Sequence, residues 1–290
     1  IAKEEEEIDL DSFQEIAVNA EPLMIEHTWD LFSKNDQAIQ ADFDLLTKDR
    51  ISAEIPDCVF CVNKEQIFVE EGAKLTIASL NASNGPIYIG EHAEVMEGCA
   101  VRGPFALCEH ATLKMGAKIY GATTVGPHSK VGGEVNNSII MGYSNKGHDG
   151  FLGNSVLGEW CNIGADSNNS NLKNNYAEVR LWDYETERFA PTGLQFCGLM
   201  MGDHSKCGIN TMFNTGTVIG VSSNIFGAGF PRNFVPSFSW GGSSGTTTYK
   251  TSKAFEVAEK VMQRRNIEFT DEDRAILEHV FEETQQYRRD

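Results

Sequence analysis

The chain has 290 residues and a formal net charge of −18. This acidity argues against a general affinity for nucleic acid or for an anionic membrane surface, because the summed field of the protein repels both. We find no signal peptide and no stretch long and apolar enough to span a membrane, so we expect a cytoplasmic protein without nucleic-acid or membrane partners.

The acidity is uneven along the chain. The region from Val101 to His148 holds two acidic residues and five basic ones, which are Arg102, Lys114, Lys118, Lys130 and Lys146. This region therefore remains able to bind a phosphate-bearing substrate.

The cysteines point to a reducing compartment. Cys99, Cys161 and Cys207 fall on inward positions of the repeat described below, which predicts buried, reduced thiols. Cys58 and Cys61 form one C-x-x-C pair with no second pair to complete a zinc site, and we predict no metal.

Residues 1–50 are not repetitive. They begin with the acidic end Lys3–Glu7, and Glu26–Leu46 carries apolar residues near helical spacing, which predicts a helix packed on a neighbouring surface. Because the chain opens on Ile1 rather than Met, we expect it to be a fragment of a longer protein.

An aliphatic residue recurs at every sixth position from Ile89 to Val131. The full series is Ile89, Val95, Val101, Leu107, Leu113, Ile119, Val125 and Val131. Two positions before each stands a mostly small residue, in the series Ile87, Ala93, Cys99, Phe105, Ala111, Ala117, Thr123 and Ser129. A helix repeats its apolar residues every three or four positions and a half-buried strand every two. A period of six is typical of a β-solenoid of hexapeptide repeats.

The period lapses around Gly132–Gly150, resumes at Leu152, and stops again for about thirty residues. It returns in the series Met201, Cys207, Phe213, Ile219 and Ile225. We predict a solenoid domain over residues 51–242, with a loop inserted at residues 166–198. Loops of that length are uncommon unless they bind something.

Residues 243–290 form a predicted helical tail. It contains two expected helices, Lys253–Asn266 and Asp271–Arg289. Thr270, followed three residues later by Asp273, is predicted to cap the N-terminus of the second helix. We interpret the tail as a cover for the open end of the solenoid, with a binding role as the alternative.

Reactive groups must lie outside the narrow aliphatic core. His92, His110, His128 and His204 recur at one outward turn position, which favours solvated turn residues. His148 differs, because the repeat is broken around it and glycines lie on both sides. An imidazole can take a proton from an attacking amine or hydroxyl at neutral pH, so His148 is the candidate general base.

The stretch from His148 to Ala165 resembles the acetyltransferase half of the bifunctional N-acetylglucosamine-1-phosphate uridyltransferase/glucosamine-1-phosphate acetyltransferase. A Gly-His turn leads into Leu152-Gly153 and then into Asn162-Ile-Gly-Ala165, with matching spacing. The chain is also similar to a bacterial group of sugar nucleotidyltransferases in which a solenoid follows an N-terminal pyrophosphorylase-like domain. The resemblance covers about residues 51–240.

The resemblance implies a left-handed parallel β-helix, a homotrimer, and acetyl-CoA held in the cleft between neighbouring solenoids. It implies that His148 is the general base and that Asn162 contacts the amino sugar. It implies that the backbone around Gly164 and Ala165 binds the coenzyme, and that Gly208 and Ile209 belong to the same binding site. The inserted loop lies where an Asn/Tyr-bearing loop of the family binds substrate, which points to Asn171 and Tyr176.

Two departures from the family concern the acceptor. A tyrosine three residues after the histidine is Phe151 here, and twin lysines are replaced by Asn136 and Asn137. Losing ammonium groups weakens phosphate binding, because charge-assisted hydrogen bonds are the strong ones. The candidates to replace them are Lys146, Lys173 and Arg180. The acceptor can therefore differ from glucosamine 1-phosphate, or activity can be lost.

Residues 1–50 lack the Gly-rich basic loop of a pyrophosphorylase domain, so we interpret them as a connector or helical remnant of a missing nucleotidyltransferase-like domain. We predict an acetyl-CoA-dependent acetyltransferase acting on an amino-sugar phosphate or nucleotide sugar in sugar-nucleotide biosynthesis. One alternative is the C-terminal part of a sugar-1-phosphate nucleotidyltransferase whose solenoid is structural or regulatory. Another is a non-catalytic trimeric scaffold.

Overall fold

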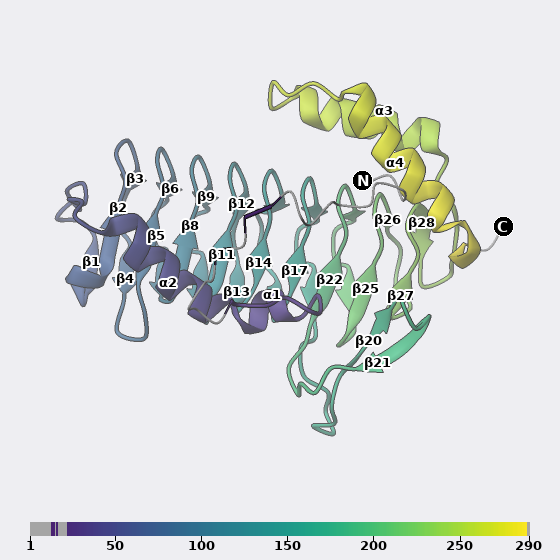
Figure 1. The fold of residues 1–290 in the computed structure, drawn as a ribbon, viewed down its shortest axis with the longest axis horizontal. Coiled ribbons are helices and arrows are strands. Elements are labelled where there is room, and N and C mark those ends of the chain that lie inside the picture. Colours follow the sequence, from purple (N-terminus) through teal and green to yellow (C-terminus); the bar gives the residue numbers. More distant parts are fainter. Residues whose placement is uncertain (1–12, 15, 17–21, 289–290) are drawn as a thin grey trace.

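The computed structural model describes residues 13, 14, 16 and 22–288 of the chain. They form a long parallel β-solenoid with helices along its first part and beyond its last turns (Figure 1). The all-β, left-handed parallel β-helix of hexapeptide repeats is therefore confirmed. The acidic end Lys3–Glu7 lies outside the described residues.

The chain visits three parallel sheets in turn, here named A, B and C. Sheet A holds, in spatial order, β1 (Phe60–Val62), β4 (Ser79–Asn81), β7 (Ala100–Arg102), β10 (Lys118–Tyr120), β13 (Glu134–Asn136) and β16 (Phe151–Gly153). Sheet B holds β2 (Ile67–Val69), β5 (Ile87–Ile89), β8 (Phe105–Leu107), β11 (Thr123–Val125), β14 (Ile139–Ile140), β17 (Val156–Leu157), β22 (Leu199–Met201), β25 (Thr217–Ile219) and β27 (Phe234–Val235).

Sheet C is the longest and carries the candidate site. It holds β3 (Lys74–Leu75), β6 (Glu94–Val95), β9 (Thr112–Leu113), β12 (Lys130–Val131), β15 (Asn145–Lys146), β18 (Asn162–Ile163), β23 (Lys206–Cys207), β26 (Asn224–Ile225), β28 (Ser239–Gly242) and β29 (Gly245–Thr248). The last pair, β28 and β29, is antiparallel and ends the winding.

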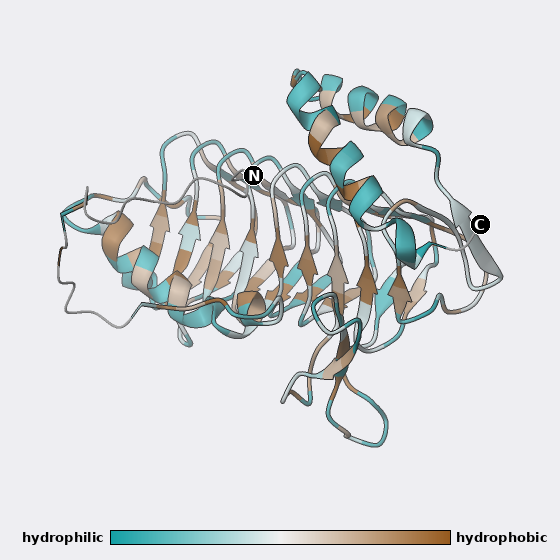
Figure 2. Cartoon of the chain, turned by 45° about the vertical axis from the view of Figure 1, so that its right-hand side comes forward, coloured by the Kyte–Doolittle hydropathy of each residue, from teal (hydrophilic) through white to brown (hydrophobic). Residues whose placement is uncertain are grey.

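The period-six residues fill the core as predicted. Each of the eight aliphatic residues from Ile89 to Val131 is exposed by 3% or less, and so is each of the small residues two positions before. The three inward cysteines, Cys99, Cys161 and Cys207, are buried free thiols. Figure 2 shows the hydrophobic colour concentrated on the strands and the hydrophilic colour on many of the turns.

The four repeated histidines share one corner of the solenoid, as the sequence predicts, and each has a positive φ. Their environment differs from the prediction. With Tyr143 and Trp160 they form a ladder of rings whose neighbouring centroids are 4.3–6.2 Å apart. All neighbouring pairs are stacked except His92 and His110, whose rings are tilted. His128 and His204 are only partly exposed. The expectation of separately solvated turn residues is therefore wrong for these two, because successive turns bring the rings into contact.

The inserted segment is shorter and more ordered than predicted. β19 (Asn168–Asn169) pairs in parallel with β24 (Met212–Phe213), so these residues still belong to the winding. Farther along, β20 (Arg180–Asp183) and β21 (Arg188–Pro191) form an antiparallel hairpin. Val179 and Leu181 are buried with Phe32 and Met200, which fixes the hairpin against sheet B.

The helix predicted over Glu26–Leu46 is two helices, α1 (Asp30–Ser33) and α2 (Asn35–Thr47), which run along sheet B (Figure 1). Asn35 fixes α2 to the solenoid. Its Nδ2 donates to the carbonyl oxygen of Ala122 at 3.0 Å, and its Oδ1 accepts from the Thr124 hydroxyl at 3.0 Å.

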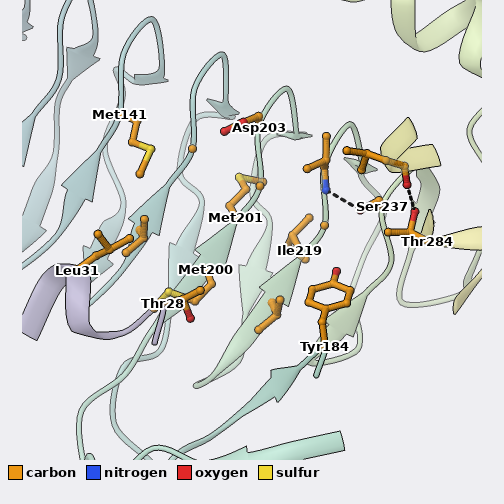
Figure 3. Close-up of a pocket in the computed structure, with 17 residues that line it drawn as sticks. Thr28, Leu31, Met141, Tyr184, Met200, Met201, Asp203, Ile219, Ser237 and Thr284 are labelled. Carbon is orange, nitrogen blue, oxygen red and sulfur yellow. Dashed lines mark hydrogen bonds between the residues drawn. The ribbon is translucent and has the colours of Figure 1, made fainter. Parts of the chain in front are cut away.

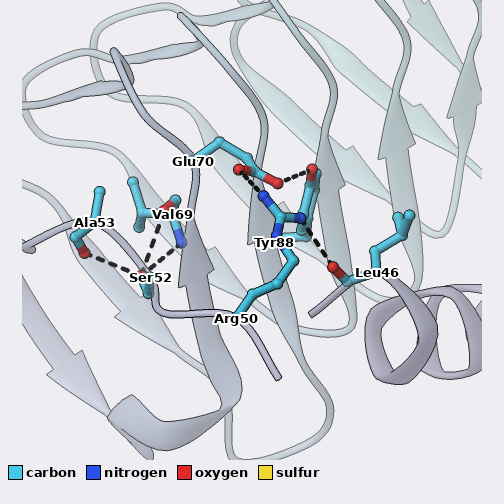
Figure 4. Close-up of polar contacts among 7 residues, drawn as sticks. All are labelled: Leu46, Arg50, Ser52, Ala53, Val69, Glu70 and Tyr88. Atoms are coloured by element: carbon cyan, nitrogen blue, oxygen red, sulfur yellow. Dashed lines mark hydrogen bonds and ion pairs between the residues drawn. The ribbon is translucent and has the colours of Figure 1, made fainter. Parts of the chain in front are cut away.

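A polar network joins the end of α2 to the first turns. Arg50 Nη2 lies 2.6 Å from Glu70 Oε2, and the Tyr88 hydroxyl donates to Glu70 Oε1 at 2.6 Å (Figure 4). A short 3-10 helix, η2 (Lys64–Gln66), precedes β2 nearby. Burial of the Glu70 carboxyl acts to raise its pKa, but the hydrogen bonds from Arg50 and Tyr88 outweigh burial and hold this pKa below its ordinary value.

The tail contains α3 (Thr251–Gln263), α4 (Asp271–Glu283) and a final 3-10 helix, η3 (Gln285–Tyr287). The predicted cap is confirmed, because Thr270 Oγ1 accepts from the Asp273 N–H and Asp273 Oδ2 accepts from the Thr270 N–H. The second predicted helix ends earlier than expected, at Glu283, and its predicted end at Arg289 lies outside the described residues. In the part of the chain that the structure describes, no helix is long and apolar enough to cross a membrane.

Replacing Glu70 with Gln should lower the free energy of unfolding at pH 7 by about 1–2 kcal/mol, the scale of hydrogen bonds to a charged group. Because the folded pKa of Glu70 is lowered, its contribution is present above the unfolded pKa and is lost as pH falls through the folded pKa. Denaturant titrations at pH 7 and near pH 3 measure this. Glu71→Gln, at an exposed neighbour, is the control, and an equal loss at both pH values would contradict the assignment.

Candidate active site

A pocket of about 620 Å³ opens beside His148, between sheet C and the end of α3. It brings together five residues that the sequence predicts for the site, namely His148, Asn162, Gly164, Ala165 and Ile209. Gly208, also predicted, lies directly under the pocket, since a Cβ on Gly164 would meet the Gly208 carbonyl oxygen at 2.3 Å.

His148 occupies the turn between β15 and β16, where the solenoid passes from sheet C to sheet A. Its side chain is exposed. Among the described residues the imidazole has no hydrogen-bond or ion-pair partner. Both ring nitrogens are thus available to a ligand in the pocket.

Glycines occupy one column of sheet C next to His148. Gly132, Gly147, Gly164 and Gly208 follow strands that pair in register. Gly132 and Gly164 are required by packing, because a Cβ there would come within 3 Å of the carbonyl oxygen on the next turn. Gly147 is not so constrained, since its nearest atom would be Lys130 O at 4.0 Å. Its missing side chain leaves space in the pocket.

Several backbone donors in the pocket are unused, among them those of Gly147 and Ala165. The N–H of Gly164 is bound to the Cys207 carbonyl oxygen at 3.1 Å and is not available. The N–H groups of Gly147 and Ala165, in contrast, have no acceptor within the described chain. They are the donors that a developing oxyanion could use.

Four cationic side chains line the same pocket: Lys114, Lys130, Arg264 and Arg265. Sheet C supplies the lysines, and the end of α3 supplies the arginines. Arg265 Nη2 lies 3.3 Å from Asn145 Oδ1, which ties the tail to β15. The lysines belong to the basic region recognised in the sequence, whereas no sequence pattern marks the two arginines as part of a site.

The prediction that Lys146 binds substrate is wrong. Its side chain is 1% exposed and occupies an inward slot of sheet C, in register with Val131. The ammonium donates to the carbonyl oxygen of His148 at 2.5 Å and so fixes the turn that carries the histidine. Burial lowers the pKa of Lys146 to about 8.

The other predicted acceptor residues lie away from this pocket. Phe151 and Asn171 meet on sheet A, both within 3 Å of the position of a Cβ on Gly153. Lys173 Nζ donates to Glu178 O at 2.7 Å, Arg180 Nη2 donates to Phe189 O at 2.5 Å, and Tyr176 is exposed in the insertion. Their role in substrate binding stays a prediction.

A second cavity, of about 550 Å³, lies outside sheet B between α1 and α4 (Figure 3). Its centre is apolar, with Met141, Met200 and Met201 among its lining. Among the described residues that line it, Asp203 alone is charged, and its carboxylate already accepts from the Glu159 N–H at 2.8 Å. The described lining of this cavity offers no imidazole and no cation, so the pocket beside His148 is the better candidate.

The chain is similar to several known proteins over parts of its length. The model of the sugar nucleotidyl transferase family matches residues 1–51. A bifunctional sugar-1-phosphate nucleotidylyltransferase/acetyltransferase of Sulfurisphaera tokodaii is 35% identical over 144 residues, which cover 49% of this chain and 35% of that protein. The bifunctional protein GlmU of Methanocaldococcus jannaschii is 32% identical over 87 residues, covering 30% of this chain and 21% of that protein. The matches thus span about a third or less of each relative.

Two solved structures show a low structural similarity to the chain. A hexapeptide transferase family protein from Anaplasma phagocytophilum has a TM-score of 0.31 and 12% identity, and covers 79% of this chain and 92% of its own. A UDP-N-acetylglucosamine acyltransferase from Arabidopsis has a TM-score of 0.30 and 15% identity, covering 76% and 78%. At these scores the likeness carries no argument, and the fold rests on the strand pairing above.

The strand pairing thus makes the chain a β-solenoid of hexapeptide repeats. More particularly, it resembles the acetyltransferase half of the bifunctional uridyltransferase/acetyltransferase enzymes, as the motif around His148 indicated.

Replacing Lys146 with Met should raise the melting temperature at pH 7 by a few degrees, because a buried ammonium is replaced by an apolar chain of similar length. The folded pKa of Lys146 lies below its unfolded value, so the parent gains stability as pH rises from about 8 toward 10.5. The advantage of the variant should shrink over that range in thermal melts. Val131→Met, at the neighbouring inward slot, is the control, and a pH-independent difference would contradict this account.

Proposed function

We propose that the chain transfers an acetyl group from acetyl-CoA to the amine of an amino-sugar phosphate or nucleotide sugar. One observation carries the proposal. The exposed imidazole of His148, which has no partner in the described chain, lines a pocket together with two glycines of sheet C and four cationic side chains. The relatives support this class of reaction, since one of them is named a nucleotidylyltransferase/acetyltransferase.

In the proposed reaction, the acceptor amine attacks the thioester carbonyl carbon while His148 takes a proton from the attacking nitrogen. The C–N bond forms, the carbonyl oxygen becomes an oxyanion, and the tetrahedral intermediate then releases the thiolate. The imidazolium of His148 returns the proton to the sulfur. The products are the amide and free coenzyme A, and no other reactant is needed.

The free N–H groups of Gly147 and Ala165 would stabilise the oxyanion. Donors fixed in the backbone stabilise developing charge well, because they need no reorganisation during the reaction. Asn162, exposed on β18 within the same pocket, would contact the amino sugar.

The coenzyme arm would lie along the glycine column, toward Ala165 and Ile209. No side chain projects from Gly147 or Gly164, so an extended pantetheine chain could approach the backbone closely. We propose in addition that the chain works as a homotrimer, as the resemblance implies.

The match of residues 1–51 to the sugar nucleotidyl transferase family supports a second candidate. In this alternative the chain is the C-terminal part of a sugar-1-phosphate nucleotidyltransferase, and the solenoid is structural or regulatory. Nucleotidyl transfer that needs only sugar 1-phosphate and a nucleoside triphosphate, with no effect of coenzyme A or of His148→Ala, would favour it.

Replacing His148 with Ala should lower kcat for acetyl transfer by about a hundredfold or more, the scale of general-base catalysis. A thiol-release assay with acetyl-CoA and an amino-sugar phosphate measures this. His110→Ala removes another exposed corner histidine, outside the pocket, and should leave kcat unchanged. Equal turnover in the parent and the His148 variant would overturn the mechanism.

Replacing Gly147 with Val should raise KM for acetyl-CoA severalfold with little change in melting temperature. The backbone has room for a side chain there, so the added methyl groups would occupy the pocket rather than strain the fold. Gly147→Ala should show a smaller effect. An unchanged KM in both variants would exclude the glycine column as the coenzyme groove.

A further inference from the structure

The four cations of the pocket are not neutralised by the protein. No carboxylate of the described chain lies within 4.0 Å of Lys114, Lys130, Arg264 or Arg265. Most other cations of the described chain also lack such a partner, and what distinguishes these four is that they line one pocket. The described lining of the pocket also contains no acidic residue. In a chain of net charge −18, four uncompensated cations around one pocket point to an anionic ligand.

The two lysines define a cationic end of the pocket. Lys130 and Lys114 lie one and two turns from the turn of His148, on the side toward the N-terminus. Arg265 contacts Asn145, which lies on the same turn as His148, next to Lys130 on the preceding turn. Ala165 and Ile209 lie on the opposite side of His148, one and two turns farther along the winding. The pocket therefore has a cationic end and a neutral end, with the histidine between them.

The distances favour the acceptor as the source of the anion. Turns of a parallel solenoid are about 4.8 Å apart, so the lysine backbones lie roughly 5 and 10 Å from the turn of His148. In an amino-sugar 1-phosphate the amine and the phosphorus are separated by only a few bonds, roughly 4–5 Å. The phosphates of coenzyme A lie beyond an extended arm of about 15 Å from the thioester. With the reacting centre at His148, the cationic end suits a phosphate on the sugar.

We infer that Lys114, Lys130, Arg264 and Arg265 bind the phosphate group of the amino-sugar acceptor. The helical tail is then part of the acceptor site and not only a cover for the solenoid. These residues replace the missing twin lysines, in place of the sequence-based candidates Lys146, Lys173 and Arg180. The inference rests on the proposed function for the identity of the acceptor.

Calorimetric titration of the full chain tests the inference by binding rather than by turnover. The probes are glucosamine 1-phosphate, glucosamine and coenzyme A. Two charge-removing pairs come from different elements: Arg264→Gln with Arg265→Gln in the tail, and Lys114→Gln with Lys130→Gln in sheet C. The matched control, Lys253→Gln with Lys260→Gln, removes two cations of α3 that pair with Glu256 outside the pocket.

Each pocket pair should raise the Kd for glucosamine 1-phosphate tenfold or more, because charge-assisted hydrogen bonds to phosphate are lost. The Kd values for glucosamine and coenzyme A should change less than twofold, and the control pair should match the parent. A higher Kd for coenzyme A, with that for the sugar phosphate unchanged, would overturn the inference and assign the cations to the coenzyme. No change for either ligand would overturn it as well.

Two further measurements separate this inference from the proposed function. His148→Ala should bind glucosamine 1-phosphate as the parent does while losing acetyl transfer. Tight, cation-dependent binding without any acetyl transfer in the parent would refute the reaction and leave the phosphate site standing. Failure of the parent to bind glucosamine 1-phosphate would refute the site. Thermal melts of all variants confirm that the solenoid and tail remain folded.

Discussion

Main-chain hydrogen bonding between successive turns determines where every outward side chain of this protein lies. Each turn adds one strand to each of three sheets, and parallel pairing stacks residues of equivalent position into columns. Lys130, Asn145, Asn162 and Lys206 form one such column on sheet C. The next column contains Gly147 and Gly164. A site in this fold is thus a local pattern in adjacent columns, and it keeps its geometry because the backbone of each turn is fixed by the turns before and after it.

The inward-facing residues impose the same constraint on the core. The aliphatic series and the small series are both buried almost completely, so the hexapeptide period predicted the core residue by residue. The register also contained the information needed to place Lys146. It stands six positions before the inward Leu152 and pairs with the inward Val131, so the period itself assigns it to the core. The positive charge of Lys146 suggested that it binds a substrate phosphate. Its position on the strand nevertheless directs the side chain into the core.

Other features of the site could not be read from the repeat. The position of Arg264 and Arg265 depends on how α3 packs back onto sheet C, and that packing is a tertiary event with no periodic signal in the tail. The ring ladder was missed for a different reason. The shared slot of the four histidines was visible, but Tyr143 and Trp160 fall 15 and 17 residues after the preceding ring rather than 18, because these turns are shorter. Only the folded winding shows that they continue the same column.

The contrast between the acidic chain and its cationic pocket has a physical consequence for ligand choice. A large polyanion such as nucleic acid meets the whole field of the protein and is repelled. A small anion inside the pocket is close to four cations, and no acidic residue is among the described lining. Exposed charges farther away than about 8 Å are largely screened at physiological ionic strength. Local attraction then exceeds the distant repulsion. The same charge distribution that disfavours extended polyanions is therefore compatible with tight binding of a single sugar phosphate, and the tail supplies half of the charges that make it so.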